Sequence, residues 1–112
     1  MKSYAIGILR NVRMGPQIVE YLERIDATLH PYGGRFVVHG GGQLVLEGTR
    51  PGDVIVIEFP DRAQAAAWYG SAEYQEILPL RTDNAVGTVL LIDGVDDDHR
   101  ATDVLAAGGA TT

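Results

Sequence analysis

Hydrophobic and polar residues alternate along four short stretches of the chain, as in strands whose two faces meet different surroundings. The four stretches are residues 4–11, 35–39, 53–59 and 85–92. In the first, Tyr4, Ile6 and Ile8 share one face, and the small residues on the other face allow another element to pack closely. The third is apolar at nearly every position except Glu58, which predicts a central strand. A shorter alternation at residues 44–47 follows a run of glycines and predicts a small inserted hairpin.

The stretch between the first two strands shows the spacing of a helix. Gly15 and Pro16 form a typical start, because proline at the first helical position gives up an N–H that has no helical partner. Apolar residues then recur three or four positions apart from Ile18 to Leu29, and Pro31 follows. The pattern predicts an amphipathic helix that ends near residue 30.

A second helical region follows the strand at residues 53–59. Asp61 and Gln64 are spaced as in a capping box, in which the Asp side chain accepts from a free amide of the first turn. The predicted helix over residues 62–69 ends at Gly70, and Ser71 caps a further helix that reaches about Asp83.

The resulting order is β-α-β-β-α-β, which predicts an α+β, ferredoxin-like domain with both helical regions on one face of an antiparallel sheet. The apolar residues on the other face then have no cover within a chain of this length. A second copy of the sheet, packed face to face, is the simplest cover. The pattern therefore predicts a homodimer.

Length and composition limit the class of protein. The chain has 112 residues, no cysteine and a formal net charge of -6, which favours one cytoplasmic domain and argues against binding to nucleic acid or to an anionic membrane. No apolar stretch approaches the roughly 20 residues that span a bilayer. We expect one domain over residues 1–95 and a mobile tail over residues 96–112, which is acidic first and then rich in small residues.

Several segments together resemble the family called domain of unknown function 1330. They are GGRFVVHGG at residues 33–41, LEG at residues 46–48, VIVIEFP at residues 54–60, AWYGSAEYQ at residues 67–75, and Arg81. The resemblance implies a dimeric α/β barrel, in which the sheets of two ferredoxin-like chains pack together. It implies no catalytic residues, because the family has no established activity.

Common site patterns do not fit the chain. His30, His39 and His99 lack the spacing of metal ligands, so we expect no metal and no bound cofactor. Ser71 follows a helix and lacks the glycine pattern of a nucleophile elbow, which favours a capping role. The three glycines after His39 lack the lysine of a phosphate loop and are more typical of a turn.

The fold gathers a different set of polar side chains. Candidate catalytic residues are Arg35, His39, Tyr69, Tyr74 and Arg81. The first two are expected on one strand face, and the last two lie seven positions apart on one helix face. An arginine in a cleft between the sheet and the second helix would stabilise an anionic oxygen, while tyrosine or histidine would carry protons. In the structural alternative, Glu58 pairs with Arg35 or Arg81 and the tyrosines anchor the helices.

Three functions remain open. The first is a cofactor-independent enzyme acting on an aromatic, keto-acid or polyketide-like compound. The second is a dimeric module that binds a metabolite or assists another protein without catalysis. In the third, purely architectural role, these polar residues only hold the fold and the dimer together.

Overall fold

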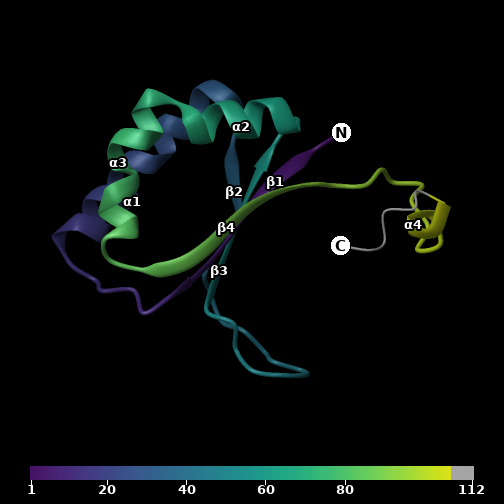
Figure 1. The fold of residues 1–112 in the computed structure, drawn as a ribbon, viewed down its shortest axis with the longest axis horizontal. Helices are drawn as coiled ribbons and strands as arrows, with labels where there is room; N and C mark the ends of the chain where they lie inside the picture. Colours follow the sequence, from purple (N-terminus) through teal and green to yellow (C-terminus); the bar gives the residue numbers. More distant parts are fainter. Residues whose placement is uncertain (107–112) are drawn as a thin grey trace.

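The computed structural model describes residues 1–106, which form an open four-stranded sheet with three helices on one face (Figure 1). The elements are β1 (Ser3–Arg10), α1 (Pro16–Leu29), the 3-10 turn η1 (His30–Tyr32), β2 (Arg35–His39), β3 (Asp53–Phe59), α2 (Arg62–Gly70), α3 (Ala72–Thr82), β4 (Val86–Asp93) and α4 (Asp103–Ala106). The strands lie in the order β2-β3-β1-β4 and every neighbouring pair is antiparallel. The predicted ferredoxin-like α+β fold is confirmed, with the sheet open in the single chain.

Local signals place the helix ends. Helix α1 begins at Pro16, directly after Gly15. The Asp61 side chain accepts a 2.8 Å hydrogen bond from the Gln64 amide and caps α2. Ser71 caps α3, because its hydroxyl accepts from the Tyr74 amide at 3.2 Å and donates to the Trp68 carbonyl at 2.7 Å. These caps satisfy amides that the first helical turn leaves free.

Strand register separates the two faces of the sheet. Ala5 lies opposite Ile57, and both are buried beneath the helices. The fully buried Phe59 and Trp68 pack against each other in the same core, with ring centroids 5.4 Å apart. The core therefore lies between the three helices α1, α2 and α3 and the end of the sheet formed by the start of β1 and the end of β3.

The opposite face of the sheet is apolar and carries no helix. Ile6 lies between Val56 of β3 and Leu90 of β4 in the register, and Val38 of β2 continues the row. The exposed fraction of Leu90 and of Val38 is 42% for each side chain. One chain thus leaves a row of aliphatic side chains in water, as the alternation predicts.

The predicted hairpin strand at residues 44–47 is wrong. Residues 41–52 form an irregular loop between β2 and β3 that extends away from the body of the protein (Figure 1). Leu44 and Leu46 are about 85% exposed and have no surface on which to pack. A strand needs a neighbouring strand and a buried face, and the loop provides neither.

The last part of the chain is described only in part. A short helix, α4, forms within the stretch predicted to be a mobile tail. The predicted mobile tail covers residues 96–112, and residues 107–112 lie outside those that the structure describes. The mobility of the tail stays a prediction. Within residues 1–106, no helix is long and apolar enough to cross a membrane.

Candidate functional site

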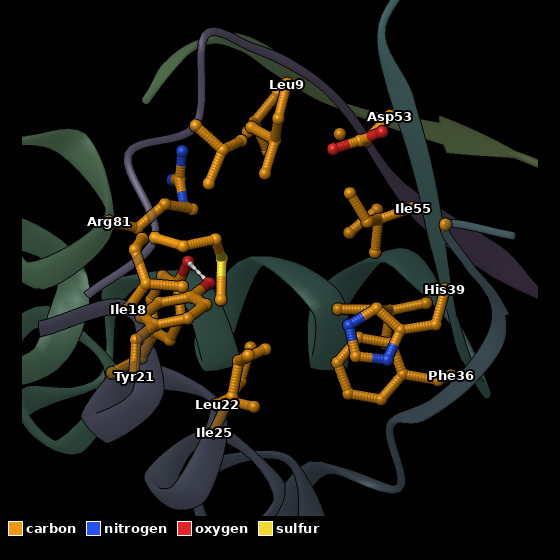
Figure 2. Close-up of a pocket in the computed structure, with 18 of the residues that line it drawn as sticks. Leu9, Ile18, Tyr21, Leu22, Ile25, Phe36, His39, Asp53, Ile55 and Arg81 are labelled. Carbon is orange, nitrogen blue, oxygen red and sulfur yellow. Dashed lines mark hydrogen bonds between the residues drawn. The ribbon is translucent and has the colours of Figure 1, made fainter. Parts of the chain in front are cut away.

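A cavity of about 190 Å³ separates α1 and α3 from the helix-covered face of the sheet. Gly7 and Ile55 lie on its sheet side, Ile18 and Ile25 on its α1 side (Figure 2). Its lining is mostly apolar. Glycine at position 7 helps to leave this space open, because the strand has no side chain there.

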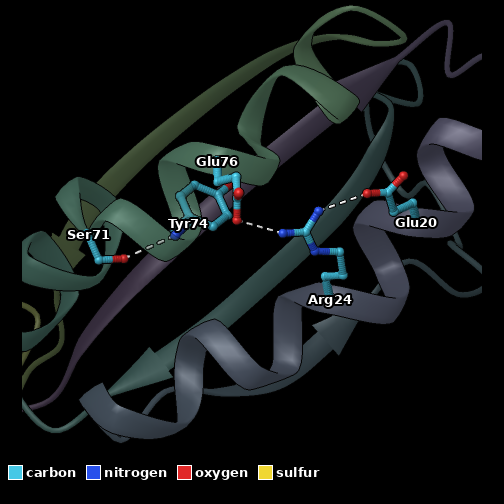
Figure 3. Close-up of polar contacts among 5 residues, drawn as sticks. All are labelled: Glu20, Arg24, Ser71, Tyr74 and Glu76. Carbon is cyan, nitrogen blue, oxygen red and sulfur yellow. Dashed lines mark hydrogen bonds and ion pairs between the residues drawn. The ribbon is translucent and has the colours of Figure 1, made fainter.

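Contacts between the helices hold the α1 wall of this cavity in place. Helix α1 packs against α3, and Arg24 of α1 joins them by donating to Glu20 at 2.8 Å and to Glu76 of α3 at 2.7 Å (Figure 3). One turn further along α1, the Trp68 indole N–H donates to the Thr28 hydroxyl at 2.9 Å. The C-terminal half of α1 is therefore tied to the α2–α3 region.

A pair of buried tyrosines forms part of the cavity wall. The hydroxyl oxygens of Tyr21 and Tyr74 are 2.8 Å apart, so one hydroxyl donates to the other. Burial raises the pKa of Tyr21 well above its ordinary value; Tyr74 adds to this effect and Arg81 offsets only part of it. Tyr21 therefore stays protonated at neutral pH, where it serves as a hydrogen-bond donor and not as a base.

Arg81 is the buried cation of the cavity. Its side chain is only 7% exposed, and its guanidinium carbon lies 5.9 Å from the centre of the Tyr21 ring. Among residues 1–106, no carboxylate forms an ion pair with it. Burial acts to lower the pKa of Arg81, but Tyr74 and Tyr21 outweigh it and the pKa lies above the ordinary value. The cavity thus contains a positive charge with no carboxylate counterion among the described residues.

His39 lies across the cavity from Arg81, stacked on Phe36 with ring centroids 4.2 Å apart (Figure 2). A β-bulge between Phe36 and Val38 shifts the alternation of β2 by one residue, so Phe36 and His39 point to the same side. Asp53 lines the same region, and its carboxylate accepts from Arg50 at 2.7 Å. The polar groups therefore occupy two opposite sides of an otherwise apolar space.

The structure separates the five sequence-predicted residues. His39, Tyr74 and Arg81 line the cavity. Arg35 does not, and the common strand face expected for Arg35 and His39 is wrong because the bulge puts them on opposite faces. Arg35 instead lies 3.1 Å from the Glu58 carboxylate on the uncovered face of the sheet, as one structural alternative expected.

Tyr69 also lies outside the cavity lining. Its ring packs against Trp68 and Tyr74, with centroid distances of 6.0 and 5.4 Å. This position fits the anchoring role in the structural alternative. Trp68 is 2% exposed and belongs to the core, although one part of it reaches the cavity.

Sequence reasoning missed Tyr21 and Asp53. Tyr21 is buried three positions after Ile18 and four before Ile25, so helical spacing was a usable signal. The apolar spacing from Ile18 to Leu29 includes Leu22 instead, which also lines the cavity but is 41% exposed. Asp53 had no such signal, since an acidic residue at the start of a strand is common on protein surfaces. In the described part of the chain, no three His, Cys, Asp or Glu side chains converge as a metal site.

Comparisons with solved structures show the same fold in other proteins. A protein of unknown function from Rhodopseudomonas palustris is 18% identical with a TM-score of 0.64, covering 85% of this chain and 83% of that one. A dimeric ferredoxin-like protein of unknown function from Jannaschia sp. CCS1 is 13% identical with a TM-score of 0.57, covering 84% and 100%. SnoaB, a cofactor-independent oxygenase from Streptomyces nogalater, is also 13% identical with a TM-score of 0.57, covering 88% and 98%. At these identities the likeness shows the fold alone.

Sequence comparison adds the family. A search of the curated proteins finds no match. The profile of the family described as a domain of unknown function (DUF1330) matches residues 2–95, which include every strand, α1 to α3 and the whole cavity lining. The chain therefore belongs to the DUF1330 family.

Proposed function

We propose that this protein is a homodimeric enzyme that acts on a small organic molecule without a bound cofactor, and that the cavity between sheet and helices is its active site. One observation carries the proposal. Arg81 is a buried cation with no carboxylate partner among the described residues, and it faces an apolar cavity beside two tyrosine hydroxyls. An uncompensated buried charge is costly, so an anion formed or bound in the cavity is the group that completes the site.

Proton abstraction next to a carbonyl is the chemistry that fits these groups. A neutral His39 would accept a proton from the substrate and become an imidazolium, while the electron pair stays on the substrate as an enolate. The Arg81 guanidinium and a tyrosine hydroxyl would stabilise the enolate oxygen on the other side of the cavity. Because the surrounding wall is apolar, these interactions are stronger there than in water.

Oxygenation is the reaction that we favour for such an enolate. The shared fold with the cofactor-independent oxygenase SnoaB makes this chemistry a reasonable analogy, although a shared fold does not establish a reaction. Dioxygen from solution would be the second substrate. A methylene group and one O₂ then give a carbonyl group and one water, so no other oxidant or reductant is needed.

The dimer proposal rests on the uncovered sheet face. The row of Ile6, Val56, Leu90 and Val38 is a continuous aliphatic surface across all four strands. The exposed area of the chain is 7514 Å², against about 6,000 Å² for a compact protein of this mass. The extended loop over residues 41–52 contributes to this excess, and a standard interface would hide about 800 Å² on each partner. The Jannaschia protein of similar fold is itself dimeric.

A noncatalytic metabolite-binding module is the second candidate. It is favoured by the state of His39, whose side chain is exposed and receives no orienting hydrogen bond from the described residues. Catalytic bases are usually oriented by a third group. In this reading Arg81 and the tyrosines bind an anion that leaves unchanged.

Turnover measurements distinguish the two candidates. The purified protein is incubated with a panel of enolisable aromatic and keto-acid compounds, while oxygen uptake and product mass are followed. If the protein is an enzyme, His39→Gln should lower kcat by about 10²- to 10⁴-fold, and Arg81→Gln should reduce kcat/KM.

Matched controls lie outside the cavity. Arg62→Gln and Tyr69→Phe remove the same chemical groups from positions that do not line it, and both should leave kcat/KM within about twofold of the parent. Binding without turnover across the panel would favour the module. Equal losses in Arg62→Gln and Arg81→Gln would refute the placement of the site.

A further inference from the structure

We infer that the ligand of this cavity is a one-ring organic monoanion, with its carboxylate or enolate at Arg81 and its ring against the apolar wall. The inference rests on the proposed function for the location of the site and narrows the ligand to a smaller class. Size, charge count and the placement of polar groups each support it.

Cavity volume sets the size of the ligand. The space is about 190 Å³, whereas pockets for drug-sized ligands occupy roughly 300–1,000 Å³. An apolar cavity of about 150 Å³ is known to hold benzene. One ring with a small substituent therefore fits within the cavity, whereas a fused system of three or four rings would extend through its open side into solvent.

The charges of the side chains that line the cavity favour a ligand with a single negative charge. Arg81 is buried and unpaired among the described residues, and the other charged side chain in the lining, Asp53, is already paired with Arg50 at 2.7 Å. A ligand with one negative charge balances Arg81. A dianion would leave one charge uncompensated in an apolar space, and a cation would face the guanidinium without a free partner.

The tyrosine pair supplies a second donor on the same side. The Tyr21–Tyr74 contact uses one hydroxyl hydrogen, so the other hydroxyl hydrogen is available to an acceptor. Tyr21 stays protonated because of its raised pKa. A guanidinium and a neutral hydroxyl together suit a carboxylate or enolate, which only accepts hydrogen bonds at these atoms.

The distribution of lining residues orients the ring. Figure 2 shows Arg81 and Tyr21 on one side of the cavity, and Phe36, His39 and Ile55 on the other. An anionic group at Arg81 therefore directs the rest of the ligand towards Phe36 and Ile55, with the His39 imidazole stacked on the Phe36 ring. This arrangement favours a ring that is unsubstituted or carries only small groups at the end remote from the anion.

Isothermal titration tests the inference with four probes, none of which requires turnover. Benzoate is the one-ring monoanion and benzamide is its neutral counterpart. Phthalate carries a second carboxylate, and anthraquinone-2-carboxylate keeps one charge on three fused rings. We expect benzoate to bind at least tenfold more tightly than each of the other three.

Two variants test charge and space separately. Arg81→Gln should weaken benzoate binding by about 10- to 100-fold, the usual effect of a lost charge-assisted hydrogen bond, and should leave benzamide binding unchanged. Gly7→Val adds methyl groups on the cavity side of β1, where a new Cβ meets only Ile55 and Val89 at 3.9 Å. It should fold and weaken benzoate and benzamide alike. Arg62→Gln, at an exposed position outside the lining, is the matched control and should bind as the parent does.

Each alternative result overturns the inference. Tighter binding of anthraquinone-2-carboxylate than of benzoate would refute the size limit and leave the proposed enzyme intact. Equal binding of benzamide and benzoate would refute the charge assignment. A dissociation constant of about 10 millimolar is on the order of the weakest affinity of use to a small-molecule site. If the folded protein binds no benzoate at that concentration, the assignment of a one-ring ligand is wrong. The proposed function is then tested separately by turnover of larger compounds.

Discussion

Replacing Arg81 with methionine should stabilise the folded chain while removing the anion-binding group from the cavity. The side chain is 7% exposed and has no carboxylate partner in the described part of the chain. Replacement of buried ionic groups by apolar side chains of similar size often stabilises a protein by about 1–4 kcal/mol. Methionine is unbranched and fills irregular spaces well, so a packing defect is not expected.

The lower end of this range applies here for two reasons. The guanidinium borders a cavity and not a fully packed core, so its desolvation is incomplete. It also lies 5.9 Å from the Tyr21 ring, a contact that contributes about 0.5–1 kcal/mol in other proteins and is lost in the variant. We therefore expect a net gain of about 1 kcal/mol, or a Tm increase of about 4–8 °C for a domain of this size.

Urea unfolding followed by Trp68 fluorescence measures the change, because this indole is buried beside the cavity. Parent and variant are compared at one protein concentration, since a dimer gains stability from mass action. Arg24→Met is the control: this exposed arginine joins α1 to Glu76 of α3, so its loss should lower stability slightly.

A particular combination of results would refute the reasoning. If Arg81→Met unfolds at a lower urea concentration than the parent and benzoate binding is unaffected, Arg81 holds the fold together and is not kept for a ligand. This is the architectural role left open by the sequence. Higher stability together with lost anion binding shows instead that the protein retains a destabilising charge for function.

Three further predictions follow from other parts of the fold. Ile6→Asp, in the middle of the uncovered sheet face, should give a monomer in analytical ultracentrifugation, whereas Leu44→Asp, on the exposed loop, should leave the mass unchanged. Burial raises the pKa of Tyr21 in the folded chain, so the stabilising effect of the protonated hydroxyl is complete below the unfolded-state pKa of about 10 and decreases at higher pH. Tyr21→Phe should therefore flatten the fall in urea midpoint between pH 9 and 11. If the midpoint falls as steeply in the variant as in the parent, the raised pKa is contradicted. Gly34→Ala should destabilise the chain by about 1–3 kcal/mol because the new Cβ would lie 2.7 Å from the buried Phe59 ring; an unchanged urea midpoint would show that the ring can move.

Local signals were sufficient for most of the secondary structure. Pro16 after Gly15, Asp61 three positions before Gln64, and Ser71 after Gly70 predict helix boundaries that the structure confirms within about one residue. Such caps act over three or four residues, so the information is contiguous in the chain. The hairpin predicted at residues 44–47 failed because alternation shows only that a strand is possible; the partner strand must come from elsewhere.

The sequence predicts only part of the candidate site, because the side chains that form it come from segments far apart in the chain. Helical spacing predicts that Tyr74 and Arg81 share a helix face, but it does not predict the contact of either residue with Tyr21 of α1. Strict alternation along β2 predicts that Arg35 and His39 share a face. A single bulge puts His39 on the other face of the sheet, and no residue type in β2 predicts that bulge.

Periodicity and nearest neighbours along the chain predict the element order, the helix caps, the fold class and an apolar sheet face that needs cover. Three features depend on the tertiary structure alone. They are the cavity that separates α1 from the sheet, the contact of Tyr21 with Tyr74, and the lack of a carboxylate beside Arg81 in the part of the chain described. Those features arise where segments distant in sequence meet, and the free energy of a buried charge depends on what surrounds it in space.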